Sequence, residues 1–155
     1  MSVEEVKSYF EKFNMKDRVL EFEVSSATVE LAAAALHCES ARIAKTLSFI
    51  AGEQVMLIVT AGDSRIDNAK YKARFGAKAK MLASDDTVKL IGHAIGGVCP
   101  FAVKEGVSVY LDESLKKFIT VFPACGSGNS AIELTIEELE KYSGYKAWVD
   151  VTKNN

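Results

Sequence analysis

Two β-rich runs separated by a four-residue connection constrain the fold of this chain more than any other feature. The runs are Thr46 to Ile50 and Val55 to Thr60, and the connection, residues 51–54, has the sequence AGEQ. Runs of this length that are rich in β-branched and aromatic residues favour strands, and a short link containing glycine favours a hairpin. The sequence therefore predicts an antiparallel strand pair within a larger sheet.

Helices and further strands are expected on both sides of this pair. Apolar residues recur at helical spacing from Val3 to Phe13, and glycines follow several other helical stretches. We expect helices over 3–13, 29–38, 68–75, 84–91 and 135–143, helical turns at ARIAK and DESLKKF, and strands over 20–24, 107–111, 118–122, 131–134 and 146–151. Because strands outnumber helices, the predicted fold is α/β (α+β), with a mixed, barrel-like sheet surrounded by helices.

The composition indicates one domain over residues 1–155. Hydrophobic residues make up 48% and charged residues 26% of the chain, as in soluble globular proteins. No apolar run approaches the roughly 18 residues that cross a bilayer, so we expect a cytoplasmic protein that binds no membrane. The net charge of −2 argues against bulk binding of nucleic acid, and we expect no DNA partner. Three widely spaced cysteines without a CxxC pair predict reduced thiols, and we expect no metal or other cofactor.

Several catalytic motifs are incomplete. Gly126, Gly128 and Ala131 form a G-x-G-x-x-A pattern, but the segment that follows favours a strand over the helix that would hold a pyrophosphate. His37 and His93 are the only histidines, and neither has a second histidine at metal-ligand spacing or a serine in a GxSxG turn. The sequence therefore predicts neither a dinucleotide-binding protein, a metallohydrolase nor a serine hydrolase.

Four segments, in this order, resemble the YbaK family. They are ARIAKTLSF, AGDSRID, GGVCPF and TVFPACGSG, and the similarity extends from about Ser25 to the last strand. The family includes free-standing relatives of the editing domain that is inserted in bacterial prolyl-tRNA synthetases. The chain departs from the family pattern at Ala102, where many relatives have glycine, and carries Cys99 at a variable position.

The resemblance implies an enzyme that deacylates mischarged tRNA in trans by hydrolysing the ester at the 3′ adenosine. The lysine of the IAKTL motif matches Lys45, which is the implied catalytic residue. The implied partners are the 3′ aminoacyl end of a mischarged tRNA and, optionally, an aminoacyl-tRNA synthetase. Two glycine loops line the aminoacyl pocket in the family, and they match Gly96 to Pro100 (the first loop) and Gly126 to Gly128 (the second loop). With the residue after the lysine, they give the implied substrate-binding residues Thr46, Gly96, Gly97, Val98, Pro100, Gly126, Ser127 and Gly128.

Each of these features also has a simpler interpretation. Ester hydrolysis needs a positioned water and a stabilised oxyanion, and an ammonium at Lys45 would suit either the oxyanion or the terminal phosphate. Alternatively, Lys45 could be a solvated lysine at a helix end, where the helix dipole favours a cation. The glycine loops could present backbone N–H groups to the substrate, or they could only turn corners.

A basic stretch offers a place for tRNA phosphates. Residues 68–84 contain no Asp or Glu, and Lys70 and Arg74 lie four apart on one predicted helix, so we expect both to contact tRNA. A solvated helix face is the alternative. A second class of function also stays open, namely a non-catalytic module that binds tRNA or a synthetase.

Overall fold

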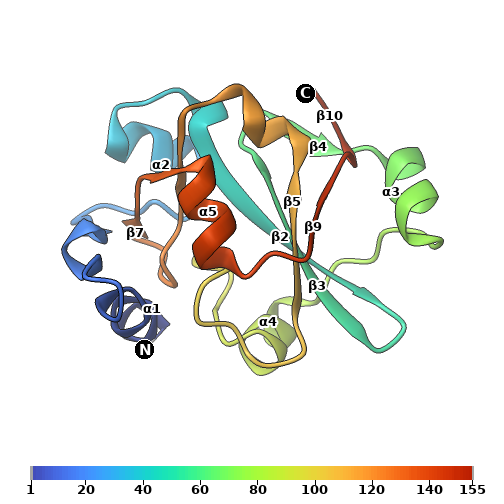
Figure 1. The fold of residues 1–155 in the computed structure, drawn as a ribbon, viewed down its shortest axis with the longest axis horizontal. Helices are drawn as coiled ribbons and strands as arrows, with labels where there is room; N and C mark the ends of the chain where they lie inside the picture. The colour runs from blue at the N-terminus through green and yellow to red at the C-terminus, as the bar shows by residue number, and fades with distance from the viewer. Residues whose placement is uncertain (1, 155) are drawn as a thin grey trace.

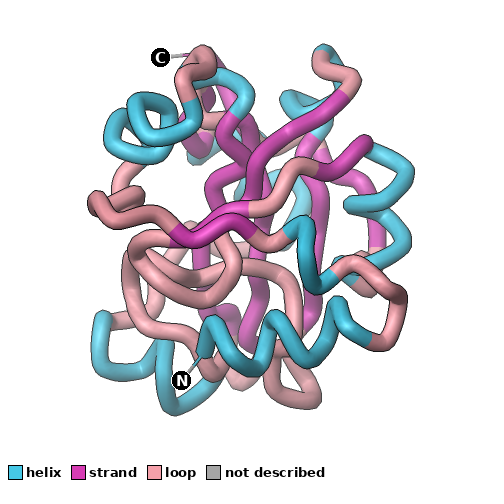
Figure 2. Tube along the Cα trace, turned by 90° about the vertical axis from the view of Figure 1, so that its left-hand side faces the viewer, coloured by secondary structure: helices cyan, strands magenta, loops and turns pink. Residues whose placement is uncertain are grey.

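The computed structural model describes residues 2–154, which form a mixed six-stranded sheet with helices around it (Figure 1, Figure 2). The sheet curls into a half-barrel, so the predicted mixed, barrel-like sheet is confirmed. Its strands, in spatial order, are β8 (Leu134–Thr135), β6 (Thr120–Pro123), β2 (Ile43–Ala51), β3 (Gln54–Ala61), β5 (Ser108–Asp112) and β9 (Ala147–Val149).

The predicted hairpin is confirmed at the centre of this sheet. Strands β2 and β3 pair antiparallel without a break from Ala44↔Ala61 to Ala51↔Gln54. Gly52, in the two-residue turn, has a φ of +62°, which glycine adopts readily. Strand β6 pairs parallel with β2 on one side, and β5 pairs parallel with β3 on the other.

Two small sheets and the helices surround the main sheet. β1 (Leu20–Glu21) pairs with β7 (Ser130–Ala131), and β4 (Ser64–Ile66) pairs with β10 (Thr152–Asn154). The helices are α1 (Ser2–Glu11), α2 (Val29–Leu36), α3 (Asn68–Phe75), α4 (Ser84–Leu90) and α5 (Ile136–Ser143), with 3-10 turns at Lys16–Arg18, Ser40–Arg42 and Glu113–Lys117. None of the helices described is long and apolar enough to cross a membrane.

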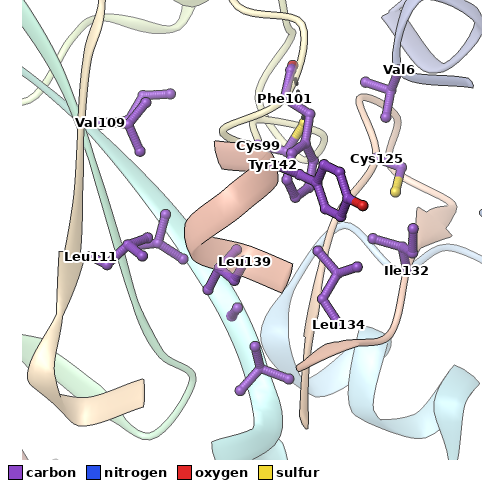
Figure 3. Close-up of a cluster of buried hydrophobic side chains, with 14 of the residues drawn as sticks. Val6, Cys99, Phe101, Val109, Leu111, Cys125, Ile132, Leu134, Leu139 and Tyr142 are labelled. Atoms are coloured by element: carbon purple, nitrogen blue, oxygen red, sulfur yellow. Dashed lines mark hydrogen bonds between the residues drawn. The ribbon is translucent and has the colours of Figure 1, made fainter. Parts of the chain in front are cut away.

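Side chains alternate between two cores along the central strands. Leu57 and Val59 of β3 face the larger core, which α1 and α5 cover, whereas Ile58 faces a smaller core that contains Tyr71 of α3. Figure 3 shows Leu139 of α5 within the larger core, among side chains of the sheet. Because both faces of the sheet are covered, β2 and β3 are apolar on both faces along most of their length.

The predicted helix ends agree with the structure where a capping signal was present. Asp67 caps the N-terminus of α3 by accepting a hydrogen bond from the Lys70 N–H, and Gly76 ends this helix at a φ of +78°. Thr135 and Glu138 form a capping box at α5, and their S/T-x-x-E spacing in the sequence is typical of one.

Four predictions of local structure were wrong. The helical turn at ARIAK covers only residues 40–42, and the chain enters β2 at Ile43 because the β6 and β3 backbones pair with it there. The strand expected over 20–24 is reduced to the two residues that pair with β7, and the strand expected over 131–134 is split between β7 and β8. The segment AGDSRID, in which no strand was expected, contains β4, because residues 152–154 pair with it.

Asp112 ties the end of β5 to the last two strands, and we expect its loss to destabilise the fold. Its fully buried carboxylate accepts hydrogen bonds from the N–H groups of Ser114 and Val151 and from the Thr152 hydroxyl, at 2.7–2.9 Å. Asp112→Ala leaves these buried donors unpaired, which should lower the free energy of unfolding by about 2–4 kcal/mol. Urea unfolding followed by circular dichroism measures this change.

Asp150→Ala is the matched control, because the Asp150 carboxylate is exposed and pairs only with the exposed Lys70. That substitution should change the free energy of unfolding by less than about 1 kcal/mol. Equal effects of the two substitutions would show that the buried carboxylate does not hold the strands together.

Candidate functional site

A cavity of about 230 Å³ lies beside β2, along the edge of this strand that faces away from β3. Its walls are residues 26–29 and 32 at the start of α2, residues 43–48 of β2, and parts of the loops that follow α4 and β6. Four of the residues predicted to bind or act on substrate line it, namely Lys45, Thr46, Gly96 and Val98. The cavity therefore brings the IAKTL motif together with the first glycine loop.

Lys45 lies in β2, and its side chain is half-buried. Its Nζ donates a hydrogen bond to the Ser64 carbonyl oxygen. Burial lowers the pKa of Lys45 below the usual lysine value, and the nearby carboxylates of Asp63 and Glu30 partly oppose this effect. The interpretation as a solvated lysine at a helix end was therefore wrong, since the preceding 3-10 turn ends at Arg42 and the ammonium is partly withdrawn from water.

Two hydroxyl groups in the cavity wall have no hydrogen-bond partner among residues 2–154. They are Thr46 Oγ1 and Ser26 Oγ, and both atoms are buried. An unpaired buried hydroxyl costs about 1–3 kcal/mol, so a fold retains few of them. Their position indicates that the cavity suits a ligand with polar groups.

The two glycine loops pack directly against each other. A Cβ atom on Gly97 would lie 2.5 Å from the Ser127 nitrogen and 2.6 Å from the Gly126 carbonyl carbon, so only glycine fits. Gly96 has a φ of +92°, and a Cβ atom there would lie 3.1 Å from that of Ala27. Gly97, Gly126 and Ser127 therefore support the cavity wall from behind.

The remaining predicted substrate-binding residues also lie behind the lining. Pro100 is buried, and the Gly128 carbonyl accepts a hydrogen bond of 2.7 Å from the Ser26 N–H, which fixes the start of α2 against the second loop. The Ser127 hydroxyl bonds to Asn129 Oδ1 and to Ser130 Oγ, so Ser127 is engaged within its own loop. Ser130, which was not predicted, lines the cavity instead.

The buried cysteines lack the features of nucleophiles. Burial raises the pKa of the Cys99 thiol to about 12 and that of Cys125 well above its usual value. His93 Nε2 lies 3.5 Å from Cys99 Sγ, but it also lies 2.7 Å from the Phe101 carbonyl oxygen, to which it donates its proton. Because that nitrogen carries the proton, it cannot accept one from the thiol.

The basic helix α3 lies apart from the residues that line the cavity. Lys70 Nζ bonds to Asp150 and to the Thr152 carbonyl, and the Arg74 guanidinium lies over the rings of Phe75 and Tyr110. Both side chains are exposed, and the proposed contact of Lys70 and Arg74 with tRNA stays a prediction.

Sequence reasoning missed several residues that line the cavity, both before and after β2 in the chain. Residues 26–29, Met81, Ile95 and Ser130 line the cavity, and Thr28 also caps α2. In the sequence, the hydroxyl cluster SSAT at residues 25–28 indicates a helix cap, but nothing in it indicates contact with a ligand. Within the described part of the chain, no group of three or more His, Cys, Asp or Glu side chains could hold a metal ion.

Gly97→Ala should separate the two loops. The added methyl group would overlap the main chain of the second loop, which cannot yield as a flexible side chain does. We expect a loss of about 1–3 kcal/mol in the free energy of unfolding, together with a changed cavity. Gly128→Ala is the control, since its Cβ atom would lie 3.4 Å from that of Ala27, an ordinary contact. Urea unfolding and a crystal structure of each variant test this, and an unchanged stability of Gly97→Ala would contradict it.

Comparisons with known proteins agree with this geometry. Residues 23–142 match the family described as the aminoacyl-tRNA editing domain. The chain is 54% identical to the uncharacterized protein YwhH of Bacillus subtilis (strain 168), over 99% of both chains. It is 30% identical to a proline–tRNA ligase of Limosilactobacillus fermentum over 61% of this chain, but spans only 18% of that ligase.

A solved structure shares the whole fold. A crystal structure described as that of a candidate trans-editing enzyme for prolyl tRNA synthetase aligns with a TM-score of 0.88 and 27% identity, over 99% of this chain and 98% of the other. The family match covers both cavity loops and the strand that carries Lys45. The chain belongs to the aminoacyl-tRNA editing domain family.

Proposed function

We propose that this protein hydrolyses the ester bond of mischarged aminoacyl-tRNA in trans. The observation that carries the proposal is a half-buried ammonium, that of Lys45, in a cavity walled by unpaired hydroxyls and a glycine loop. Family membership supports the substrate class, because the family is described by aminoacyl-tRNA editing. The similarity to part of a proline–tRNA ligase favours tRNA, and optionally a synthetase, as partners.

The reaction needs no covalent intermediate with the protein. Water adds to the carbonyl carbon of the acyl group, and the bond between that carbon and the ribose oxygen then breaks. The water proton passes to the ribose oxygen, which leaves a free amino acid and a tRNA with a free 3′ terminus. The protein must position the water and stabilise the negative charge that develops on the carbonyl oxygen.

Lys45 provides the positive charge for this step. Its ammonium is partly withdrawn from water, where a charge acts more strongly than in bulk solvent. It would lie near the developing oxyanion or the 3′ adenosine phosphate. Gly96 and Val98 would contact the aminoacyl group beside it, and Gly97, Pro100, Gly126, Ser127 and Gly128 would hold the walls of the cavity in place.

Lys45→Met should lower the rate of deacylation by about 100- to 1,000-fold, because it removes the charge and keeps most of the side-chain volume. The assay incubates a panel of mischarged tRNAs with the protein and measures loss of the ester. Lys146→Met, at an exposed lysine outside the cavity, is the control and should keep the wild-type rate. A rate for Lys45→Met within a few-fold of wild type would contradict the role of Lys45, and no hydrolysis by the wild type would favour a non-catalytic binding module.

Two further measurements separate a catalytic lysine from a structural one. The ammonium loses its proton below the usual lysine pKa, so the protein-dependent rate should fall as the pH rises through this lowered value. Because the folded-state pKa is lower than the unfolded one, the charged form disfavours folding, and stability rises as the pH increases through the folded pKa. Lys45→Met should therefore not lower the urea midpoint at neutral pH, whereas a mainly structural lysine would.

The basic segment should contribute to tRNA binding through phosphate contacts. Each neutralised phosphate adds about 0.7–0.9 to the slope of log affinity against log salt concentration. The double substitution Lys70→Gln with Arg74→Gln should therefore reduce this slope by about 1.4–1.8. Filter binding of tRNA between low and moderate salt measures it. Lys12→Gln with Lys16→Gln is the control, with one lysine in the turn after α1 and the other in the 3-10 turn that follows. An unchanged slope for the first pair would place the tRNA elsewhere.

A further inference from the structure

The edge of β2 that faces away from β3 is hydrogen-bonded to other segments at its two ends but not in the middle. Strand β6 pairs with Ile43 and Ala44. At the other end, the Ile50 N–H donates to the Lys80 carbonyl at 2.9 Å, and the Leu82 N–H donates to the Ser48 carbonyl at 3.2 Å. Residues 45–47 therefore form a gap in the sheet edge, and all three line the cavity.

The pleat of β2 directs the main chain of one residue into this gap. In an antiparallel pair, the N–H and C=O groups of successive residues point alternately toward and away from the partner. Ser48 and Ile50 point away from β3, since they bond to residues 80–82, and the register with β3 has no bulge. The same alternation directs the N–H and C=O of Thr46 away from β3 and into the cavity.

These two groups of Thr46 have no partner among residues 2–154. No hydrogen bond joins them to β6, to residues 80–82 or to the glycine loops. The Thr46 hydroxyl is likewise unpaired and buried. One residue thus offers a donor and an acceptor side by side, at the point where the sheet edge lacks a neighbour.

A single α-amino acid unit fits such an opening. Two residues in a hydrogen-bonded antiparallel pair exchange both of their N–H···O=C bonds, with their Cα atoms about 5.5 Å apart. The ammonium and carbonyl groups of an aminoacyl ester have the same arrangement as the N–H and C=O of one residue. A longer extended peptide would meet the edge positions that β6 and residues 80–82 already occupy.

The geometry points to Thr46 as the residue that recognises the aminoacyl group, through its main chain. The Thr46 N–H donates to the acyl carbonyl oxygen, and the Thr46 C=O accepts from the α-ammonium group. This inference rests on the proposed function and specifies how the substrate is held. The same N–H stabilises the charge that develops on the carbonyl oxygen when water adds to the carbonyl carbon.

This pairing predicts a preference for L-aminoacyl groups and a requirement for the amino group of the substrate. Side chains of directly opposed residues lie on the same face of a sheet, so an L-aminoacyl group places its side chain on the face of the Thr46 side chain. A D-aminoacyl group would place it on the opposite face. An acyl group without the amino nitrogen loses the bond to the Thr46 carbonyl altogether.

Three non-hydrolysable adenosines test the pairing in the full chain. They are 3′-L-alanylamino-, 3′-D-alanylamino- and 3′-propionylamino-3′-deoxyadenosine. Alanine is used because it is the smallest amino acid whose Cα atom is a stereocentre. In ¹⁵N–¹H spectra, the L-alanyl compound should shift the Thr46 amide more than the amides of Lys45 and Leu47, which pair with β3 and serve as internal controls. The propionyl compound should bind about 10- to 100-fold more weakly, as expected for loss of one hydrogen bond to a charged group. The D-alanyl compound should bind more than about threefold more weakly, because it cannot keep both main-chain bonds and also place its methyl group on the face of the Thr46 side chain.

Other outcomes would overturn the pairing. Affinities of the three compounds within about threefold of one another, or binding that leaves the Thr46 amide unshifted, would exclude it. Absence of binding by all three at their solubility limits would exclude it as well. Ester hydrolysis is measured separately, so binding with the expected preference but without hydrolysis would contradict the proposed function alone, and hydrolysis without the preference would contradict the pairing alone.

Discussion

The unbroken pairing of β2 with β3 is the constraint on which the rest of the structure depends. It fixes which side chains of β2 face each core, and it sends the main chain of every second residue toward the outer edge. Strand β6 and residues 80–82 cover that edge at its two ends. The cavity lies where this cover is interrupted, so a shift of one residue in the register would place Lys45 and Thr46 on exchanged faces.

Close contact between main chains keeps the cavity walls rigid. Gly97 touches the second glycine loop at a distance that no other residue allows, and the Gly128 carbonyl binds the segment before α2. The first loop continues to Ala102, which has a φ of +52°, a conformation that costs an alanine about 1–2 kcal/mol and a glycine almost nothing. This strain explains physically why a glycine suits that position better, and the buried Phe101 next to it holds the alanine in place.

The sequence predicted the parts of the fold that depend on local signals. The hairpin, the caps at Asp67 and Thr135 and the helix end at Gly76 were all visible in short patterns. The missed parts depend on pairing between distant segments, such as β4 with β10 and residues 80–82 with β2. The same distinction holds for the cavity. Sequence motifs predicted Lys45 and Gly96 as site residues, whereas Ser26 and Met81 line the cavity only because of tertiary contacts.

Several groups that weaken the folded state border one cavity, and this clustering favours a functional role for it. A lysine partly withdrawn from water, two unpaired hydroxyls and a strand edge without a neighbour all border the same cavity. Each weakens the folded state, and folds tolerate such groups mainly where a ligand compensates for them. The buried thiols differ, because protonated Cys99 and Cys125 pack as small apolar groups. Under the proposed function, the cavity would polarise and position a bound ester, which suits hydrolysis by water and not attack by the protein itself.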